Sequence, residues 1–441
     1  MTENDIDLKA YAFVPKIIEI KELNSTKTSN EALKGSIAER EITDLSDILD
    51  NIPAIVMQYF SDLSDRKIYV IIKGIKYGFY ESDYKEFYKF IYKIHELKNL
   101  SDIVSIEYIT EKVLLWIVDI YIHQFSTENL NTYLSNIIDN DINKYTFYYP
   151  ILNIDIEEEF LIGDAQITYF TKEYFNQLFE KKNSANITDK EFNELYRKYE
   201  GRVFVAVEVK AERKLASKIA YEKACYAIDI LKLTSSTVSI PFEKCFLELE
   251  SKIPLKYEYI SFKNDNQFDI SFHTKVNKNH QAIYKSEMIK GIMPLFNQFG
   301  KLFKSTLDLE NILKHSIIFC SKCISEDDLH LRISKLIMIL ESIFLKDNET
   351  NRMVIKCKTR FLSFNSSSNF EYNNKLKLVL DNMYEIRHNM THKSIRVYID
   401  NNELRTFQIE LIDTLFRLSK KSRFYKTKDK LIDYLDEKLN T

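Results

Sequence analysis

Residues 384–392 read YEIRHNMTH, and this stretch decides how the C-terminal part of the chain is interpreted. Arg387 precedes His392 by five positions, and the polar residues His388 and Asn389 lie between them. Apolar residues at helical spacing come before the stretch, at Leu376, Leu378, Val379, Leu380 and Met383. We therefore predict that the motif lies at the end of a helix over 373–390.

Arginine and histidine together suit the cleavage of RNA without a metal ion. Histidine can accept or release a proton near neutral pH. Arginine is always charged and can donate two hydrogen bonds to phosphate oxygens, where negative charge grows in the transition state. On a continuous helix, side chains five residues apart point roughly 140° away from each other. Arg387 and His392 can therefore converge if the helix ends near Met390, or if two chains pair and combine their motifs.

With its flanking segments, the motif resembles that of a known family. The pair Arg387 and His392 resembles the R-x(4–6)-H motif of HEPN ribonuclease domains. The preceding Tyr384 resembles the tyrosine that opens that motif. Two upstream segments resemble the preceding helices of such domains: LESIF at 340–344 and KTRFL at 358–362. The resemblance covers about 320–420 and is closest to anti-phage HEPN proteins of the ApeA type.

The resemblance implies a fold, an activity and a partner. HEPN domains are helical bundles that dimerise, and their Arg/His motifs meet at the dimer interface. The ribose 2′-hydroxyl attacks the adjacent phosphate and leaves a 2′,3′-cyclic phosphate, with no cofactor and no metal ion. By this resemblance, His392 transfers the proton and Arg387 binds the phosphate. The implied partners are an RNA substrate, with tRNA as one candidate, a second copy of the chain and a phage-derived trigger.

The same resemblance suggests supporting residues and one departure. Glu341 is expected to orient Arg387 through a charge-assisted pair. Some related toxins are silenced by nucleotidylation of a tyrosine two positions after the histidine, and here that position is Ser394. The supporting residues that we predict are His388, Asn389, Glu341 and Arg360.

Several other interpretations stay open on the sequence alone. The HEPN module could bind RNA or a partner protein without catalysis. In that case Arg387 and His388 would only complement the negative end of a helix, with His392 in a loop. The basic residues near the C-terminus could contact an RNA backbone or form a solvated helix face. These residues are Lys393, Arg396, Arg405, Arg417, Lys420, Lys421, Arg423, Lys426, Lys428 and Lys430.

Two segments resemble parts of metal sites. Glu208 and Lys210 end the strand-like segment RVFVAVEVK, which resembles half of a PD-(D/E)xK metal nuclease site. The second acid of such a site would be Asp164, which lies far upstream in a turn. Cys320 and Cys323 form a lone C-x-x-C, whereas zinc needs four ligands. Charged strand ends and packed thiols are the commoner explanations.

Composition excludes other classes of enzyme. The 441 residues include only 7 glycines and 6 prolines, which favours long helices. The sequence has no G-x-G-x-x-G and no P-loop motif, which argues against an ordinary dinucleotide-binding protein and against a P-loop ATPase. The net charge of −3 gives no global basic field. The polar N-terminus and the five irregularly spaced cysteines indicate a cytoplasmic protein. The apolar run 113–122 indicates a buried helix, and we expect no membrane segment.

The predicted fold class is α+β. We expect a mainly helical region over 1–140, a mixed α/β domain over 141–300 that senses or regulates, and a HEPN helical bundle over 301–441. The periodicity of apolar residues predicts a helical patch over 42–49 and strands over 67–72, 202–209 and 237–249. It also predicts helices over 301–316, 327–345, 351–362, 403–420 and 428–439.

Overall fold

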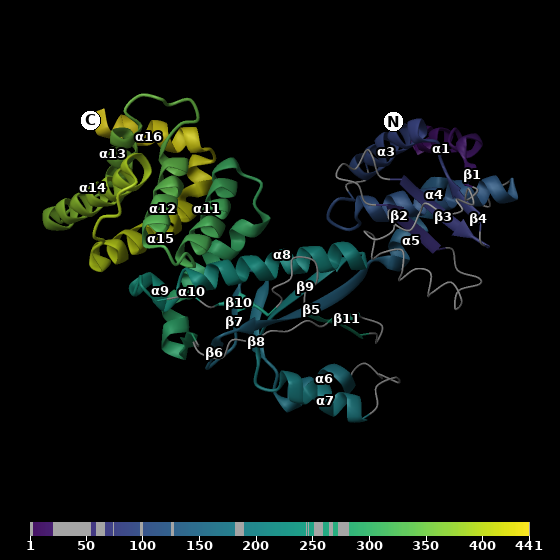
Figure 1. The fold of residues 1–441 in the computed structure, drawn as a ribbon. Coiled ribbons are helices and arrows are strands. Elements are labelled where there is room, and N and C mark those ends of the chain that lie inside the picture. The colour runs from purple at the N-terminus through teal and green to yellow at the C-terminus, as the bar shows by residue number, and fades with distance from the viewer. Residues whose placement is uncertain are drawn as a thin grey trace, which may run out of the picture. The chain divides into compact units, whose positions relative to one another are not determined.

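The computed structural model combines helices with several small sheets, which confirms the α+β class (Figure 1). The chain divides into two compact units, 1–144 with 210–216, and 145–209 with 217–441. Most of 141–300 and all of 301–441 therefore lie in the second unit. The structure describes residues 3–20, 54–58, 67–73, 75–97, 100–124, 128–180, 189–243, 245, 247–250, 259–263, 268–271 and 282–440. The helix predicted over 42–49 lies outside these residues.

The first unit packs helices with an antiparallel sheet of strand order β1-β4-β3-β2. The predicted strand over 67–72 is β3, and the apolar run 113–122 lies in a helix whose Val113, Leu114 and Ile117 are fully buried. No described helix is long and apolar enough to cross a membrane. The elements are α1 (Glu3–Tyr11), η1 (Val14–Lys16), β1 (Ile18–Ile20), β2 (Ala54–Gln58), β3 (Lys67–Ile72), β4 (Ile75–Gly78), α3 (Glu81–Leu97), α4 (Ile106–His123) and α5 (Leu130–Asp141).

The second unit begins with a sheet of strand order β12-β11-β5-β9-β8-β7, in which β10 also pairs with β5. A separate pair joins β6 and β13 in parallel. The predicted strand over 202–209 is β9, whose residues 203–207 are all buried, and only Glu208 and Lys210 are exposed along it. The elements are β5 (Asn143–Leu152), β6 (Ile154–Ile156), β7 (Phe160–Ile162), β8 (Ala165–Tyr169), α6 (Lys172–Glu180), α7 (Asp189–Tyr199), β9 (Val203–Ala211), α8 (Arg213–Lys232), α9 (Ser236–Ser239), β10 (Glu248–Leu249), β11 (Tyr259–Lys263), β12 (Phe268–Ser271) and β13 (Ala282–Tyr284).

The strand predicted over 237–249 is wrong. The segment begins as the short helix α9, and only the two residues of β10 are extended in a sheet. Pro241 cannot donate a ladder hydrogen bond, and side chains from later helices bind the local carbonyls instead. Arg332 donates to the Pro241 carbonyl at 2.6 Å, and Gln408 donates to the Val238 carbonyl at 3.0 Å.

The C-terminal part of the second unit is helical, as predicted. The contacts of α11 with α12 and α15, and of α14 with α12 and α15, form its centre. Fully buried residues such as Leu313, Leu336, Leu340 and Leu411 fill the space between these helices. The elements are α10 (Ser286–Lys301), η4 (Leu302–Lys304), α11 (Asp308–Ile324), α12 (Leu329–Phe344), α13 (Met353–Asn365), α14 (Phe370–Lys393), α15 (Asn401–Tyr425) and α16 (Lys428–Asn440).

The helix predicted over 301–316 is wrong in its first part, because the chain breaks between two helices there, and only 308–316 is helical as predicted. α10 ends at Lys301, η4 follows, and α11 begins at Asp308. Ser305 is extended, and its hydroxyl accepts a hydrogen bond from the backbone N–H of Leu307 at 3.2 Å. A serine side chain that binds nearby backbone competes with helix formation, which explains the break.

Candidate functional site

The motif YEIRHNMTH lies inside the last turns of α14. This helix begins after Asn369, whose side chain accepts from the backbone N–H of Tyr372 at 3.1 Å. It continues to Lys393 and ends at Ser394, which has a left-handed backbone with φ of 54°. The proposal that the helix ends near Met390 is therefore wrong, and His392 is a helical residue rather than a loop residue.

Arg387 is fixed by a carboxylate on the neighbouring helix α12. Its Nη1 donates to Oε1 of Glu341 at 2.6 Å, which is the charge-assisted pair that the sequence suggested. The two side chains are 28% and 17% exposed, so the pair lies at the margin of the bundle rather than in its core. Glu341 thereby holds the guanidinium against α12 while part of it remains in contact with solvent.

The two histidines share the exposed end of α14. His388 and His392 are four residues apart, and their ring centroids lie 5.0 Å from each other. Both residues are exposed. Lys393 donates to the side-chain oxygen of Asn389 at 2.9 Å, which adds a cation to the same turn. The end of α14 therefore presents two imidazoles and an ammonium group to solvent.

Within one chain, the arginine and the histidines do not meet. Because α14 is continuous, Arg387 and His392 point roughly 140° apart. Arg387 faces α12, and the described residues show no hydrogen bond or ring contact between it and either His388 or His392. The geometry of a single chain thus leaves only the second way in which the motif can converge, which is pairing between two chains.

Tyr384, which opens the motif, belongs to the core. It is 7% exposed, and burial raises the pKa of its phenol well above the ordinary value. Burial also raises the pKa of the nearby Cys357 thiol to about 12. Both groups are therefore protonated at neutral pH, and neither is a nucleophile. Tyr384 positions α14 by packing.

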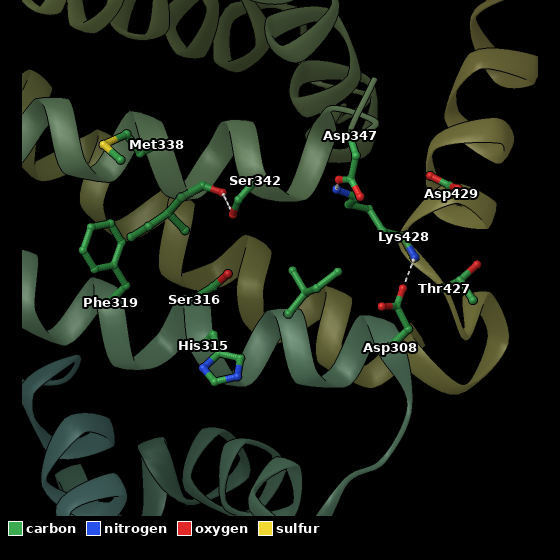
Figure 2. Close-up of a pocket in the computed structure, with 12 residues that line it drawn as sticks. Asp308, His315, Ser316, Phe319, Met338, Ser342, Asp347, Thr427, Lys428 and Asp429 are labelled. Atoms are coloured by element: carbon green, nitrogen blue, oxygen red, sulfur yellow. Dashed lines mark hydrogen bonds and ion pairs between the residues drawn. The ribbon is translucent and has the colours of Figure 1, made fainter. Parts of the chain in front are cut away.

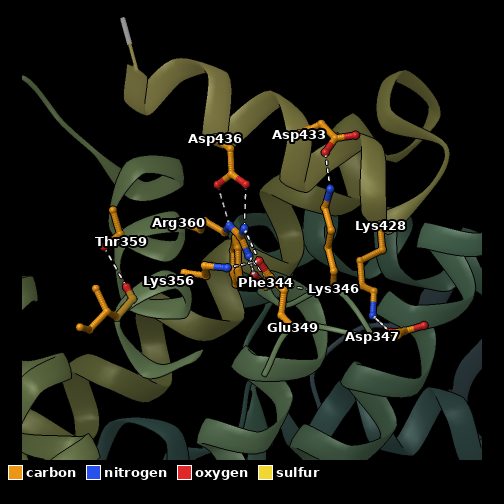
Figure 3. Close-up of polar contacts among 11 residues, drawn as sticks. Phe344, Lys346, Asp347, Glu349, Lys356, Thr359, Arg360, Lys428, Asp433 and Asp436 are labelled. Atoms are coloured by element: carbon orange, nitrogen blue, oxygen red, sulfur yellow. Dashed lines mark hydrogen bonds and ion pairs between the residues drawn. The ribbon is translucent and has the colours of Figure 1, made fainter. Parts of the chain in front are cut away.

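Arg360 lies in a different cluster, which Figure 3 shows. It is 3% exposed and binds the Phe344 carbonyl, both carboxylate oxygens of Glu349 and both of Asp436. These five bonds, between 2.6 and 2.9 Å, use all five N–H donors of a guanidinium. The contacts of Arg360 therefore tie α13 to the loop after α12 and to α16, and none of them reaches Arg387.

The contrast between the two arginines bears on function. Arg360 has no donor left for a ligand, whereas Arg387 makes one hydrogen bond to a residue that the structure describes. An arginine with unused donors can bind a phosphate group. Sequence reasoning found both arginines but not the acids that satisfy Arg360, because Asp436 lies 76 positions away along the chain.

The residues of the PD-(D/E)xK alternative do not assemble a metal site. Glu208 and Lys210 are exposed on one face of β9. The carboxylate of Asp164 is bound by Lys223 at 3.1 Å and by Lys304 at 2.5 Å. Among the residues that the structure describes, no group of three His, Cys, Asp or Glu side chains is placed to hold a metal ion.

The C-x-x-C pair is packed inside the bundle. Cys320 and Cys323 are both buried on α11, and burial raises the pKa of Cys323 to about 12 and raises that of Cys320 well above its ordinary value. Of the histidines nearest in sequence, His315 is exposed and His330 contacts the Val397 carbonyl at 2.9 Å. The two cysteines are therefore packed, protonated thiols.

The basic residues near the C-terminus are spread from the end of α14 to the start of α16. Arg405 and Arg423 lie on the same helix, α15, but 18 residues and thus roughly 27 Å apart. Others are engaged within the chain, since Arg396 binds Asp328 at 2.6 Å and Arg417 binds Asp413 at 2.7 Å. Any contact with an RNA backbone would use only part of this set.

A pocket of about 920 Å³ lies between α11, α12 and α16 and contains no residue of the motif (Figure 2). Phe319 and Met338 line one end of it, and charged residues line the other. At the charged end, Asp308 accepts from the Lys428 backbone N–H at 3.2 Å, and the Lys428 ammonium binds Asp347. Because this pocket contains no residue of the motif, the end of α14 remains the candidate site.

Comparisons of the chain with family models, with curated proteins and with solved structures found no match. The functional interpretation therefore depends on the residues and their geometry, together with the resemblance of the motif.

Proposed function

We propose that this chain is a metal-independent endoribonuclease of the HEPN type. The observation that supports the proposal is the arrangement at the end of α14. There, Glu341 holds Arg387 while donors of its guanidinium remain unused, and His388 and His392 are exposed one and five residues further along the same helix. A charged fork for phosphate and a proton-transfer group are the two elements that cleavage by the 2′-hydroxyl requires.

In the proposed reaction, the ribose 2′-oxygen attacks the adjacent phosphorus. The O2′–P bond forms, the P–O5′ bond breaks, and the 2′-hydroxyl proton passes to His392. A protonated imidazole supplies the proton that the leaving 5′-oxygen needs, and the products carry a 2′,3′-cyclic phosphate and a 5′-hydroxyl. Arg387 stabilises the charge that grows on the phosphate oxygens.

We propose further that two copies of the chain form the active site. α14 directs Arg387 and His392 to different faces, so the second copy would bring its own motif to the exposed end of this helix. The resemblance to HEPN domains supports such a homodimer. It also supports a cytoplasmic setting, a role as a toxic effector in abortive infection against phage, a substrate such as tRNA, and control by residues 1–300 in response to a phage-derived trigger.

The test is cleavage of total cellular RNA by purified protein in excess EDTA, with analysis of the RNA ends. The parent should leave cyclic phosphates, whereas His392→Ala and Arg387→Ala should lose at least about a hundredfold in rate. His315→Ala on α11 and Arg197→Ala on α7 are matched controls, because both residues are exposed and lie outside the motif and outside the C-terminal basic set.

The outcome separates the proposal from its competitors. Loss of cleavage in EDTA, with activity that depends on Glu208 or Lys210, would contradict it and favour a metal nuclease. RNA binding without cleavage, unchanged in His392→Ala, would indicate a non-catalytic module. If the parent is inactive alone, the same comparison is repeated with phage-infected cell extract, where cleavage must again depend on His392.

A further inference from the structure

A second pocket lies where the turn between β7 and β8 meets α8, α10 and α15. Its volume is about 370 Å³, which lies toward the lower end of the range of roughly 300–1,000 Å³ for small-molecule sites. Four cationic side chains and one carboxylate line it. They are Lys223, Lys301, Lys304, Arg423 and Asp164.

The charges in this pocket are not balanced. Asp164 binds two of the four cations, Lys304 and Lys223, and these hydrogen bonds hold the pKa of its carboxyl below the ordinary value. Lys301 and Arg423 have no ion-pair partner among the described residues. The Lys223 side chain is 13% exposed, so most of it lies inside the protein. The pocket therefore has an excess of positive charge that an anion would neutralise.

The remaining wall of the pocket is aromatic and apolar. Phe303 and Tyr226 lie with ring centroids 5.7 Å apart, and Ile162 adds an aliphatic surface. The Tyr226 hydroxyl donates to the Phe299 carbonyl at 3.0 Å, which fixes that ring. A ligand that carries both an anionic group and a flat or apolar group would contact both parts of the lining.

Backbone contact between two glycines fixes the shape of the pocket. A Cβ atom at Gly300 would lie 2.2 Å from the backbone nitrogen of Gly163, which is impossible without a shift. Gly163 itself has φ of +60°, a conformation that glycine adopts readily. The turn that carries Asp164 is thus held directly against the end of α10, which carries Lys301.

We infer that this pocket binds a small organic phosphate of mononucleotide size. The phosphate would contact Lys301, Lys304 and Arg423, since ammonium and guanidinium groups bind phosphate through charge-assisted hydrogen bonds. The organic group would lie against Phe303 and Tyr226. The limited volume favours a single small ligand over an RNA strand. This inference does not depend on the ribonuclease proposal, because it concerns different residues and is tested by binding.

The test is isothermal titration of the full-length protein with AMP, with adenosine and with inorganic phosphate. AMP should bind more tightly than either fragment. Lys301→Glu and Arg423→Glu should each weaken AMP at least about tenfold. Each variant has a matched control on its own helix, Lys290→Glu on α10 and Arg405→Glu on α15, which should change affinity by less than about twofold.

Each result supports or overturns the inference. Tight binding of AMP that is lost only in the two pocket variants supports it. No binding of AMP or phosphate at millimolar concentration overturns it, as does binding that the pocket variants leave unchanged. If an RNA oligonucleotide binds through Lys301 and Arg423 while AMP does not, the pocket is part of an RNA path and the small-ligand assignment is wrong.

Discussion

Replacing Arg360 with methionine should destabilise the helical bundle. This tests whether Arg360, unlike Arg387, acts by holding the fold together. Methionine keeps much of the side-chain length but removes all five hydrogen bonds to Phe344, Glu349 and Asp436. Breaking a buried ion pair by removing one partner costs about 3–5 kcal/mol, because the other charge is left unpaired.

The surroundings of Arg360 place the expected loss at the lower end of that range. Glu349 keeps Lys356 at 2.9 Å and the backbone N–H of Lys346 at 3.0 Å. The Asp436 side chain is already 41% exposed and regains water. The Phe344 carbonyl loses its Arg360 hydrogen bond. We therefore expect a loss of about 3 kcal/mol in the free energy of opening.

The matched control is Lys346→Met, which breaks an ion pair in the same region (Figure 3). Lys346 and Asp433 are 2.5 Å apart, but their side chains are 37% and 57% exposed. Exposed pairs contribute about 1 kcal/mol or less, so this variant should be nearly neutral. Hydrogen exchange followed by mass spectrometry on peptides from α13 and α16 measures the opening free energy locally.

Fluorescence of Trp116, the single tryptophan, reports on the first unit and should not change in the Arg360 variant.

Arg360 holds the pKa of Glu349 well below the ordinary 4.5. A lowered pKa in the folded state gives a stabilisation that is present above about 4.5 and is lost as pH falls. The parent should therefore lose protection in acid more steeply than the variant. A loss below about 1 kcal/mol at pH 7 would refute the reasoning.

Three further predictions concern other parts of the second unit. Burial raises the pKa of Asp229 to about 6. The free energy of unfolding should therefore fall as pH rises from about 4 to about 6. Asp229→Asn should raise it at pH 7.5 by about 1–3 kcal/mol, measured by thermal unfolding. An unchanged melting temperature would contradict the burial argument. Gly300→Ala should lower the free energy of unfolding, measured by calorimetry, by about 1–3 kcal/mol. Gly291→Ala, with open space around it, should be neutral or slightly stabilising. Equal effects would argue against the contact between Gly300 and Gly163. Glu341→Gln should keep the fold by circular dichroism but slow RNA cleavage about tenfold, and an unaltered rate would mean that Glu341 does not orient Arg387.

The sequence predicted the helical bundle better than the rest of the fold. α12, α14, α15 and α16 have apolar residues at helical spacing over many turns, so their periodicity is strong. The failures at 237–249 and 301–316 have a local cause, since Pro241 and Ser305 interrupt patterns that otherwise look regular. Contacts across the chain supply what the pattern lacks, because carbonyls in the first of these segments are bound by side chains from α12 and α15.

The candidate site was predictable in part for the same reason. The helix that carries Arg387 and His388 follows from the apolar spacing before it, but its predicted end at Met390 left His392 outside, and Glu341 follows from the resemblance of its segment. The role of Arg360 could not be read from the sequence, because its partners Glu349 and Asp436 lie on either side of it along the chain and meet it only in the folded bundle.

The two buried arginines of the bundle use more of their donors on the protein than Arg387 does. Arg332 is 2% exposed and binds carbonyls of Glu326 and Pro241, and Arg360 spends every N–H on the protein. Arg387 spends one N–H on Glu341 and is 28% exposed. Because Arg387 is partly exposed, its remaining donors can bond to water and can equally bond to a phosphate. Its position on the same helix as the exposed His388 and His392 is the physical reason to test for phosphate binding there.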